Sequence, residues 1–200
     1  TSIGEGSDEE TRLNASPIIA QGRVYTMDSQ TLVSAFDTDD GAEIWSQNLT
    51  PDEEDDGHIG GGIAFEDGRI IATTGFAEVI ALDAGSGQVL WRRNVGGPMR
   101  AAPTVRGGRA FVVTVDNKLF ALNAADGTVL WTHSGIQEGA SLLGGASPAV
   151  DAGIVVVAYT SGELVALKVE TGRVLWTDVL AAVRRSNVVA TFSHIRGRPV

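Results

Sequence analysis

Residues 52–57 form the densest run of acidic side chains, with five carboxylates followed by Gly57. Oxygen ligands at positions 1, 3 and 5 with glycine at position 6 resemble the start of a calcium loop of the EF-hand type. Position 12 of such a loop needs a bidentate glutamate, but here it is Ile63. The flanking sequence also indicates strands rather than helices. We therefore interpret the run as a solvated acidic loop that could attract a basic partner through a salt-screened field.

The other side chains with catalytic or ligand potential are dispersed. His58, His133 and His194 are far apart and lack the close spacing of a local zinc motif. The chain has no cysteine, which excludes disulfides, cysteine metal sites and cysteine nucleophiles, and it has no Gly-x-Ser-x-Gly nucleophile elbow. Three glycines at 60–62 lack the lysine and the helix of a phosphate loop, so we expect them where backbones crowd. No catalytic constellation is predicted.

A repeated segment determines where these side chains lie. Its four copies span residues 35–45, 81–91, 121–131 and 166–176, and each ends in Gly-x-x-x-Trp. The four tryptophans of the chain all take this last position, at Trp45, Trp91, Trp131 and Trp176. A period of 40 to 46 residues indicates a repeat architecture. One large apolar side chain per repeat predicts, in all four copies, packing between neighbouring sheets.

Each repeat reads as short β-branched or aromatic strands separated by turns rich in Gly, Asp and Asn. Segments of helical length are missing between the strands, which favours antiparallel sheets. The sequence therefore predicts an all-β fold, a β-propeller of four-stranded antiparallel blades with about four blades in residues 14–200. Residues 1–13 are predicted to be a flexible acidic lead-in. Strands are expected at 16–20, 23–27, 32–36 and 43–47, at 102–105, 110–114 and 119–122, and at 147–150, 154–158 and 164–167.

The C-terminal residues indicate whether the predicted propeller ring could close. Pro199 falls where Pro148 stands in the fourth repeat, which indicates that a further blade starts there. An open sheet face favours association. A piece of a larger ring, a half-ring that pairs with a copy of itself, and a closed four-blade ring all remain open at this point.

The charge is uneven. The net charge is −10, and residues 1–56 contain 14 acidic and 2 basic side chains. Nucleic-acid-binding proteins present a basic face, so nucleic acid is not a predicted partner.

The pattern Ala-Leu-Asp-x-x-x-Gly-x-x-x-Trp, with x-Pro-x-Val before it, resembles the PQQ-type propeller repeat over about residues 14–200. Residues 16–25, 39–46 and 141–148 most resemble the BamB family of that superfamily. The resemblance implies an eight-bladed ring, of which this chain would hold about half. It also implies a non-catalytic periplasmic scaffold on the inner face of the outer membrane, with a lipid anchor upstream and no cofactor. The partners implied are BamA-like POTRA domains and unfolded outer-membrane proteins.

Two family loops suggest where partners would bind. The first has a Leu, then an Arg before a Gly, and here Leu142 matches the Leu while Leu143 takes the Arg position. The second reads Ser-Asp-x-Asp-x-x-Pro, and here His194 and Arg196 replace both acids. Loops on a rigid scaffold often carry binding, and exposed leucines beside arginines suit an interaction surface. The predicted partner-binding residues are Leu142, Leu143, Arg184, Arg185, His194, Arg196 and Arg198.

Two other functions are open alternatives. A PQQ-dependent quinoprotein dehydrogenase of this superfamily would need Ca²⁺ held by Glu, Asn and Asp, a catalytic Asp, and usually a cysteine pair near the cofactor. The chain has no cysteine, and its acids fall mostly in turns. A generic ligand-sensing propeller would need a membrane span and a signalling domain elsewhere in the gene.

Overall fold

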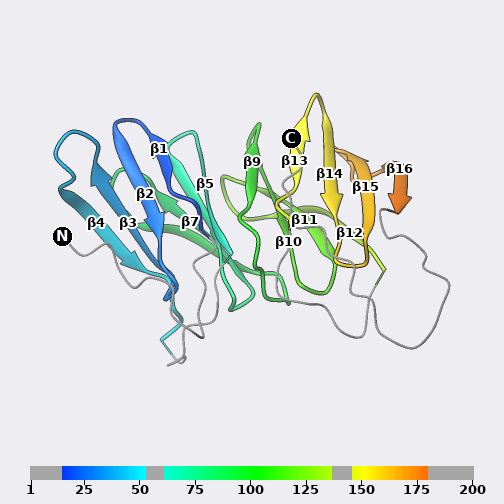
Figure 1. The fold of residues 1–200 in the computed structure, drawn as a ribbon, viewed down its shortest axis with the longest axis horizontal. Coiled ribbons are helices and arrows are strands. Elements are labelled where there is room, and N and C mark those ends of the chain that lie inside the picture. The colour runs from blue at the N-terminus through cyan, green and yellow to red at the C-terminus, as the bar shows by residue number, and fades with distance from the viewer. Residues whose placement is uncertain (1–14, 53–60, 137–145, 180–200) are drawn as a thin grey trace.

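The computed structural model describes residues 15–52, 61–136 and 146–179. In these ranges the chain forms sixteen strands in four separate four-stranded antiparallel sheets. The sheets follow one another in chain order, with β1–β4 at one end of the molecule and β13–β16 at the other (Figure 1). This arrangement confirms the prediction of an all-β fold with about four propeller blades. Among the described residues, no helix is long or apolar enough to cross a membrane.

Each blade is a simple up-and-down meander that runs from a short inner strand to a six-residue outer strand. Blade 1 comprises β1 (Ile18–Ala20), β2 (Arg23–Met27), β3 (Leu32–Asp37) and β4 (Glu43–Asn48). Blade 2 comprises β5 (Gly62–Glu66), β6 (Arg69–Thr73), β7 (Glu78–Asp83) and β8 (Val89–Asn94). Blade 3 comprises β9 (Thr104–Arg106), β10 (Arg109–Val113), β11 (Lys118–Asn123) and β12 (Val129–Ser134). Blade 4 comprises β13 (Ala149–Asp151), β14 (Ile154–Ala158), β15 (Glu163–Lys168) and β16 (Val174–Val179).

The expected strands are present, with one consistent difference at the inner strands. Pro17, Pro103 and Pro148 were expected inside the opening strands, but each lies just before the strand begins. Proline has no N–H to donate to a neighbouring strand, so pairing starts one residue later. Blade 2 has no such proline, and Gly61 stands where backbones crowd. A Cβ on Gly61 would lie 2.6 Å from the Ala101 carbonyl oxygen, which confirms the expectation for this glycine.

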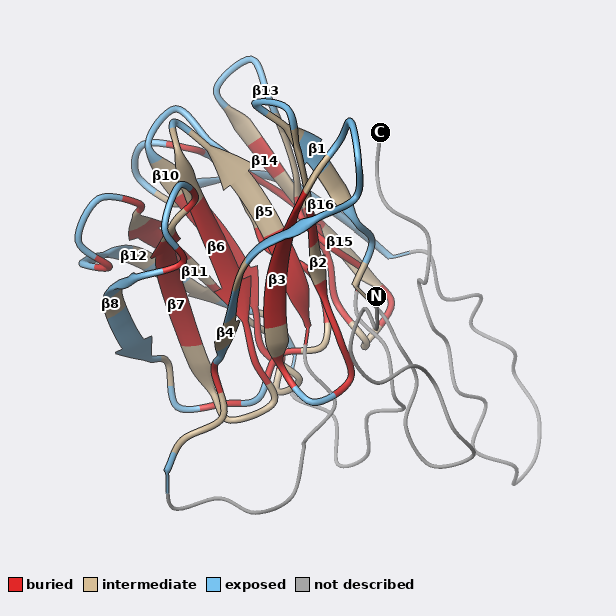
Figure 2. Ribbon diagram, turned by 90° about the vertical axis from the view of Figure 1, so that its left-hand side faces the viewer, coloured by how far each residue is buried: buried red, intermediate tan, exposed pale blue. Residues whose placement is uncertain are grey.

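The core lies between the blades. We call the side of a blade that faces the next blade in the chain its forward face, and the opposite side its back face. The forward faces of blades 1, 2 and 3 pack on the back faces of blades 2, 3 and 4, and each contact forms one hydrophobic cluster. The middle strands are buried and the outer strands are largely exposed (Figure 2).

Three of the four repeated tryptophans join blades in the same way. The indole N–H donates to a backbone carbonyl of the next blade: Trp45 to Ala84 at 3.1 Å, Trp91 to Ala124 at 3.1 Å and Trp131 to Val169 at 2.8 Å. Each ring also lies over the repeated glycine of that blade. A Cβ added to this glycine would come within 2.6 Å of the indole, and the three glycines are Gly87, Gly127 and Gly172.

Only glycine fits these junctions, for two reasons. Gly172 has a φ of +68°, which side chains seldom adopt. Its Cα is also covered by the Trp131 ring. The turn that presents the glycine is held as expected, by short side chains that accept backbone N–H groups, such as Asn123 from Ala125 and Asp126 from Thr128.

The expectation that all four tryptophans pack between sheets is wrong for Trp176. Its side chain is 45% exposed, and its indole N–H has no acceptor among the described residues. The other three are half-buried. The physical reason is that no further blade of the described chain lies against the forward face of blade 4.

Candidate functional site

All seven predicted partner-binding residues lie outside the described residues: Leu142 and Leu143 fall in 137–145, and Arg184, Arg185, His194, Arg196 and Arg198 fall in 180–200. Four of the five carboxylates of the acidic loop lie in 53–60, and the lead-in lies in 1–14. These assignments stay predictions. The described structure does show the residues from which the predicted loops start.

These starting points share one edge of the molecule, which we call the connection face. It holds the β2–β3, β6–β7, β10–β11 and β14–β15 turns together with the segments that lead from one blade to the next. In three blades, the residue that leaves the outer strand donates its N–H to a turn carbonyl of the same blade: Leu49 to Thr31, Val95 to Ala77 and Gly135 to Asn117. Topology therefore places the described residues that precede 53–60 and 137–145 on the same face as four hairpin turns.

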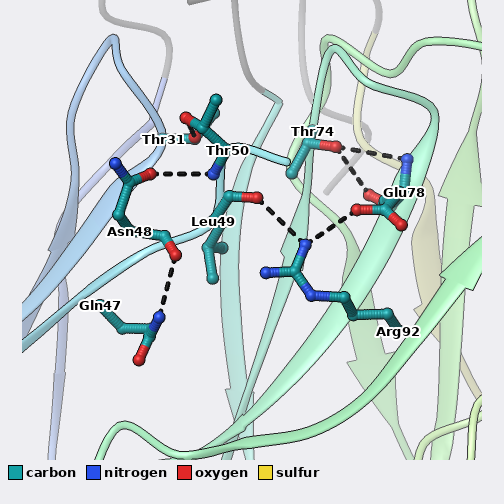
Figure 3. Close-up of polar contacts among 8 residues, drawn as sticks. All are labelled: Thr31, Gln47, Asn48, Leu49, Thr50, Thr74, Glu78 and Arg92. Atoms are coloured by element: carbon teal, nitrogen blue, oxygen red, sulfur yellow. Dashed lines mark hydrogen bonds and ion pairs between the residues drawn. The ribbon is translucent and has the colours of Figure 1, made fainter. Parts of the chain in front are cut away.

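The segment before residues 53–60 is held by hydrogen bonds. Thr50 donates its backbone N–H to the Asn48 side chain at 2.8 Å, and its hydroxyl lies 2.9 Å from that of Thr31. Arg92 of blade 2 donates to the Leu49 carbonyl at 3.1 Å and to Glu78 at 2.9 Å, so it joins the exit of blade 1 to a hairpin of blade 2 (Figure 3). The acidic loop thus starts from a fixed point, Leu49, which is fully buried.

The segment before residues 137–145 is held from two blades. Asn117 of blade 3 donates its amide to the Ile136 carbonyl at 2.7 Å, and Glu163 of blade 4 accepts the Ile136 N–H at 2.6 Å. The Asn117 side-chain oxygen in turn accepts the backbone N–H and the hydroxyl of Thr160. Ile136 itself is 61% exposed, so the hydrogen bonds fix its backbone while its side chain faces solvent.

The strands expected at 110–114 and 119–122 place Asn117 in a hairpin turn, but the sequence gives no sign that Asn117 or Glu163 binds the Ile136 backbone. The turn is confirmed, because Asn117 has a φ of +60° and its N–H donates to the Thr114 carbonyl. A polar residue at the tip of a hairpin is expected for the turn alone. No signal in the sequence links it to Ile136, 19 residues away.

His133 of blade 3, close to Ile136 in the sequence, forms a pair with Tyr159 of blade 4 at the same junction. His133 Nδ1 is 2.8 Å from the Tyr159 hydroxyl, and the two rings stack with centroids 5.9 Å apart. Burial lowers the pKa of His133, an effect partly opposed by Glu163, and burial together with Glu163 raises the pKa of Tyr159. Both groups are therefore neutral near pH 7, and the pair packs blade 3 on blade 4.

Further acids and bases on this face are engaged in local contacts. Burial raises the pKa of Asp116, but hydrogen bonds from Lys118 and Thr114 outweigh it and leave the pKa lowered. On the outer strand of blade 2, Arg93 donates its side-chain N–H to the Gly127 carbonyl of blade 3 at 2.8 Å. Among the described residues, no group of three or more His, Asp or Glu could hold a metal ion.

The connection between blades 2 and 3 is described throughout, and it packs inward. Met99 is fully buried and donates its N–H to the Thr74 carbonyl, while the Pro98 carbonyl accepts the N–H of Val115. Thr74 and Val115 are both hairpin residues of the connection face. This connection therefore covers the connection face between blades 2 and 3.

A cavity of about 900 Å³ lies along the inner strands. Its lining is drawn from all four blades and is largely apolar, with Ile18, Phe65, Val105 and Val156 among its residues. Trp176 also lines it, so the cavity reaches from the first inner strand to the outer strand of blade 4.

Comparison with known proteins places the chain in a family. The family model described as "Outer membrane protein assembly factor BamB" matches residues 28–200, most of the chain. The chain belongs to the BamB family. The "Outer membrane protein assembly factor BamB" of Yersinia pestis is 31% identical to it over 138 residues, which are 66% of this chain and 35% of that protein. This BamB-family chain spans about a third of the length of the curated relatives it matches.

Solved structures agree on the fold. BamB from Moraxella catarrhalis superposes with a TM-score of 0.68 at 23% identity, covering 84% of this chain and 48% of that one. A quinohemoprotein alcohol dehydrogenase from Pseudomonas putida HK5 superposes with a TM-score of 0.70 at 18% identity, covering 87% of this chain and 35% of that one. At these identities the likeness shows a shared propeller architecture. The BamB assignment therefore rests on the sequence match over residues 28–200.

Proposed function

We propose that this BamB-family chain is a periplasmic scaffold of the outer-membrane protein assembly machine. In this role it binds the POTRA region of a BamA-like protein and assists delivery of unfolded β-barrel clients. The observation that carries the proposal is the family match over residues 28–200, because this is a family of outer-membrane protein assembly factors. The role is non-catalytic, needs no cofactor and places the protein at the inner face of the outer membrane.

The described geometry supports a binding role for the connection face. The segment leading to Leu142 and Leu143 starts at Ile136, whose backbone Asn117 and Glu163 hold from two blades. A loop that starts from a fixed backbone loses less conformational entropy when it binds a partner. We therefore infer that Leu142 and Leu143 contact the POTRA surface, and that Arg184, Arg185, His194, Arg196 and Arg198 extend the same contact.

Binding of the purified chain to a BamA-like POTRA fragment at low salt tests this proposal. Leu142→Glu should weaken the affinity at least tenfold, because it introduces a charge into an apolar contact. Leu130→Glu is the matched control: Leu130 is 44% exposed on the outer strand of blade 3, away from the connection face, and the affinity should stay unchanged. No association of the wild-type chain with the fragment would refute the proposal.

The contribution of the fixed starting point can be tested separately. Asn117→Ala removes the hydrogen bond to Ile136 without altering Leu142. We expect a loss of affinity of about threefold to tenfold, since the loop then has more freedom to lose. An unchanged affinity would show that Leu142 binds independently of its support.

A quinoprotein dehydrogenase is the second candidate function. The observation in its favour is the fold shared with the Pseudomonas putida quinohemoprotein alcohol dehydrogenase. Addition of PQQ and Ca²⁺ to the chain, followed by absorbance and dye-reduction measurements with an alcohol, tests it. Cofactor absorbance retained after gel filtration, together with dye reduction, would favour the enzyme over the scaffold.

A further inference from the structure

The exits of blades 1, 2 and 3, by which we mean the residues that follow their outer strands, share one hydrogen bond and differ in the next. The first exit residue of each blade donates its N–H to a hairpin carbonyl of the same blade. In blades 1 and 2 the second exit residue donates to the asparagine side chain that ends the outer strand, Thr50 to Asn48 and Gly96 to Asn94, both at 2.8 Å. An asparagine side chain is uncharged, so these two hydrogen bonds do not depend on pH.

Blade 3 holds the same N–H in a different way. Its outer strand ends in Ser134, where blades 1 and 2 have asparagine. The Ile136 N–H donates instead to Oε2 of Glu163 in blade 4, at 2.6 Å. The same carboxylate oxygen accepts the hydroxyl of Ser161 at 2.9 Å. The exit of blade 3 is therefore held by a group that carries a charge and belongs to the neighbouring blade.

The exit of blade 3 also packs on the pair formed by His133 and Tyr159. A Cβ on Gly135 would lie 2.5 Å from the Tyr159 ring, so the exit backbone is in contact with that ring. The Tyr159 hydroxyl is 2.8 Å from His133 Nδ1 and 3.4 Å from the His133 carbonyl oxygen. Burial raises the pKa of Tyr159, so the phenol stays neutral and cannot balance a positive charge on His133.

Glu163 is a carboxylate whose charge acts on this histidine. Burial lowers the pKa of His133, and the charge of Glu163 opposes part of that shift. Other charged residues near the exit have local contacts: Lys118 on the adjacent strand forms an ion pair with Asp116 at 2.7 Å, and Asp178 on β16 is exposed to solvent. Glu163 therefore has two competing partners, the Ile136 N–H and a protonated His133.

We propose that the exit of blade 3 is a proton-operated latch, in which Glu163 holds the Ile136 N–H only while His133 is neutral. When His133 takes up a proton, the imidazolium attracts the Glu163 carboxylate, and the Ile136 N–H is released to water. This attraction is stronger at a partly buried junction than in bulk water. The protonated Nδ1 donates to the Tyr159 oxygen, whose own hydrogen turns to the His133 carbonyl, so the stacked pair stays in contact.

The latch controls how firmly one residue of the connection face is oriented. The Ile136 carbonyl also accepts the Asn117 amide, so release of the N–H removes one of the two hydrogen bonds that hold this backbone. The Ile136 side chain is 61% exposed, and its direction follows from that backbone. Because the pKa of His133 lies below the ordinary value of about 6.5, acidification to about pH 5 loosens the exit of blade 3 and leaves the exits of blades 1 and 2 unchanged.

Amide hydrogen exchange of the 200-residue chain, followed by NMR from about pH 7.5 to about pH 5, tests the proposal. After correction for the intrinsic pH dependence of exchange, protection of the Ile136 amide should fall about tenfold, because a hydrogen bond to a charged acceptor is lost. The midpoint should coincide with the titration of His133, read from its own ring signals. The Thr50 and Gly96 amides are internal controls, and their protection should stay constant.

Four variants separate the parts of the latch. His133→Gln and Glu163→Gln should each keep the Ile136 amide protected across the whole range, since the first cannot take up a proton and the second accepts the N–H without a charge. Glu163→Ala should leave that amide about tenfold less protected at every pH. Ser134→Asn restores the arrangement of blades 1 and 2, so it should maintain protection at about pH 5 as well.

Each of three results would overturn the proposal. The first is protection of the Ile136 amide that stays constant while His133 titrates. The second is an equal loss at Thr50 and Gly96, which would show that the whole connection face loosens. The third is a loss of protection that persists in His133→Gln or in Glu163→Gln. Circular dichroism confirms that each variant is folded, and Glu163→Gln keeps the test decisive if a change in the packed histidine prevents folding.

Discussion

Trp131 and Trp176 occupy the same position of the repeat, 45 residues apart, yet only one of them completes a junction. Trp131 donates to Val169 and lies over Gly172, and its ring is 5.9 Å from that of Phe111. Trp176 has the same flanking Val and Leu but lacks an acceptor among the described residues. The repeat therefore encodes only half of each junction, and the other half is the glycine turn of whichever blade lies next to it.

Truncation of the tryptophan should give the largest difference in stability between the Trp131 and Trp176 positions. Trp131→Ala should lower the free energy of unfolding by about 3 kcal/mol, because it removes packing between two blades and a hydrogen bond. Trp176→Ala should cost under about 1 kcal/mol, because Trp176 is 45% exposed. Urea denaturation measures both losses, and equal losses would show that Trp176 is packed as tightly as Trp131.

Substitution of the receiving glycine isolates the cost of contact. Gly172→Ala and Gly41→Ala introduce the same backbone strain of about 1 kcal/mol, because the φ angles are +68° and +69°. Only Gly172→Ala also forces a Cβ to within 2.6 Å of an indole ring, which should add about 1–3 kcal/mol. The same denaturation experiment gives the difference, and no difference would mean that the Trp131 ring moves aside without cost.

The smallest expected effect is a pH dependence of the free energy of unfolding, caused by His133 at the junction of blades 3 and 4. Burial lowers the pKa of His133 in the folded chain, so the unfolded chain binds its proton more readily. This contribution to stability is complete above the unfolded pKa of about 6.5 and is lost as pH falls below it. Because the ring is partly exposed, the loss should stay below about 1 kcal/mol.

His133→Gln should flatten the stability profile between about pH 5 and pH 7. The equivalent residue of blade 4 is Asp178. Thermal unfolding in buffers across the range measures the slope. The carboxylates with lowered pKa, including Asp83 and Asp116, act at more acidic pH and are unaffected by the substitution.

The fold could be predicted from sequence because its signals are local and repeated. Gly41 and Trp45 share one turn, and the same turn recurs in every blade. The exposure of each tryptophan could not be predicted in the same way. Trp176 matches its equivalents by sequence, but its exposure depends on whether another blade packs against it.

The contacts of the candidate site could be predicted even less well from the sequence. Ile136 is held by Asn117 and Glu163, which come from two blades and lie 19 and 27 residues away. Arg92 and Arg93 are adjacent in the sequence, yet each donates to a backbone carbonyl of a different neighbouring blade. Such contacts depend on packing geometry, for which a single sequence carries no signal.

The tryptophan bonds also have a direction, since each one runs from a blade to the blade that follows it. A linear array fastened in this way has a stability that is close to a sum over blades and their nearest-neighbour junctions. Among the described blades, blades 2 and 3 take part in two junctions each. The Trp91 junction joins these two blades, so its loss would uncouple both halves of the described array at once.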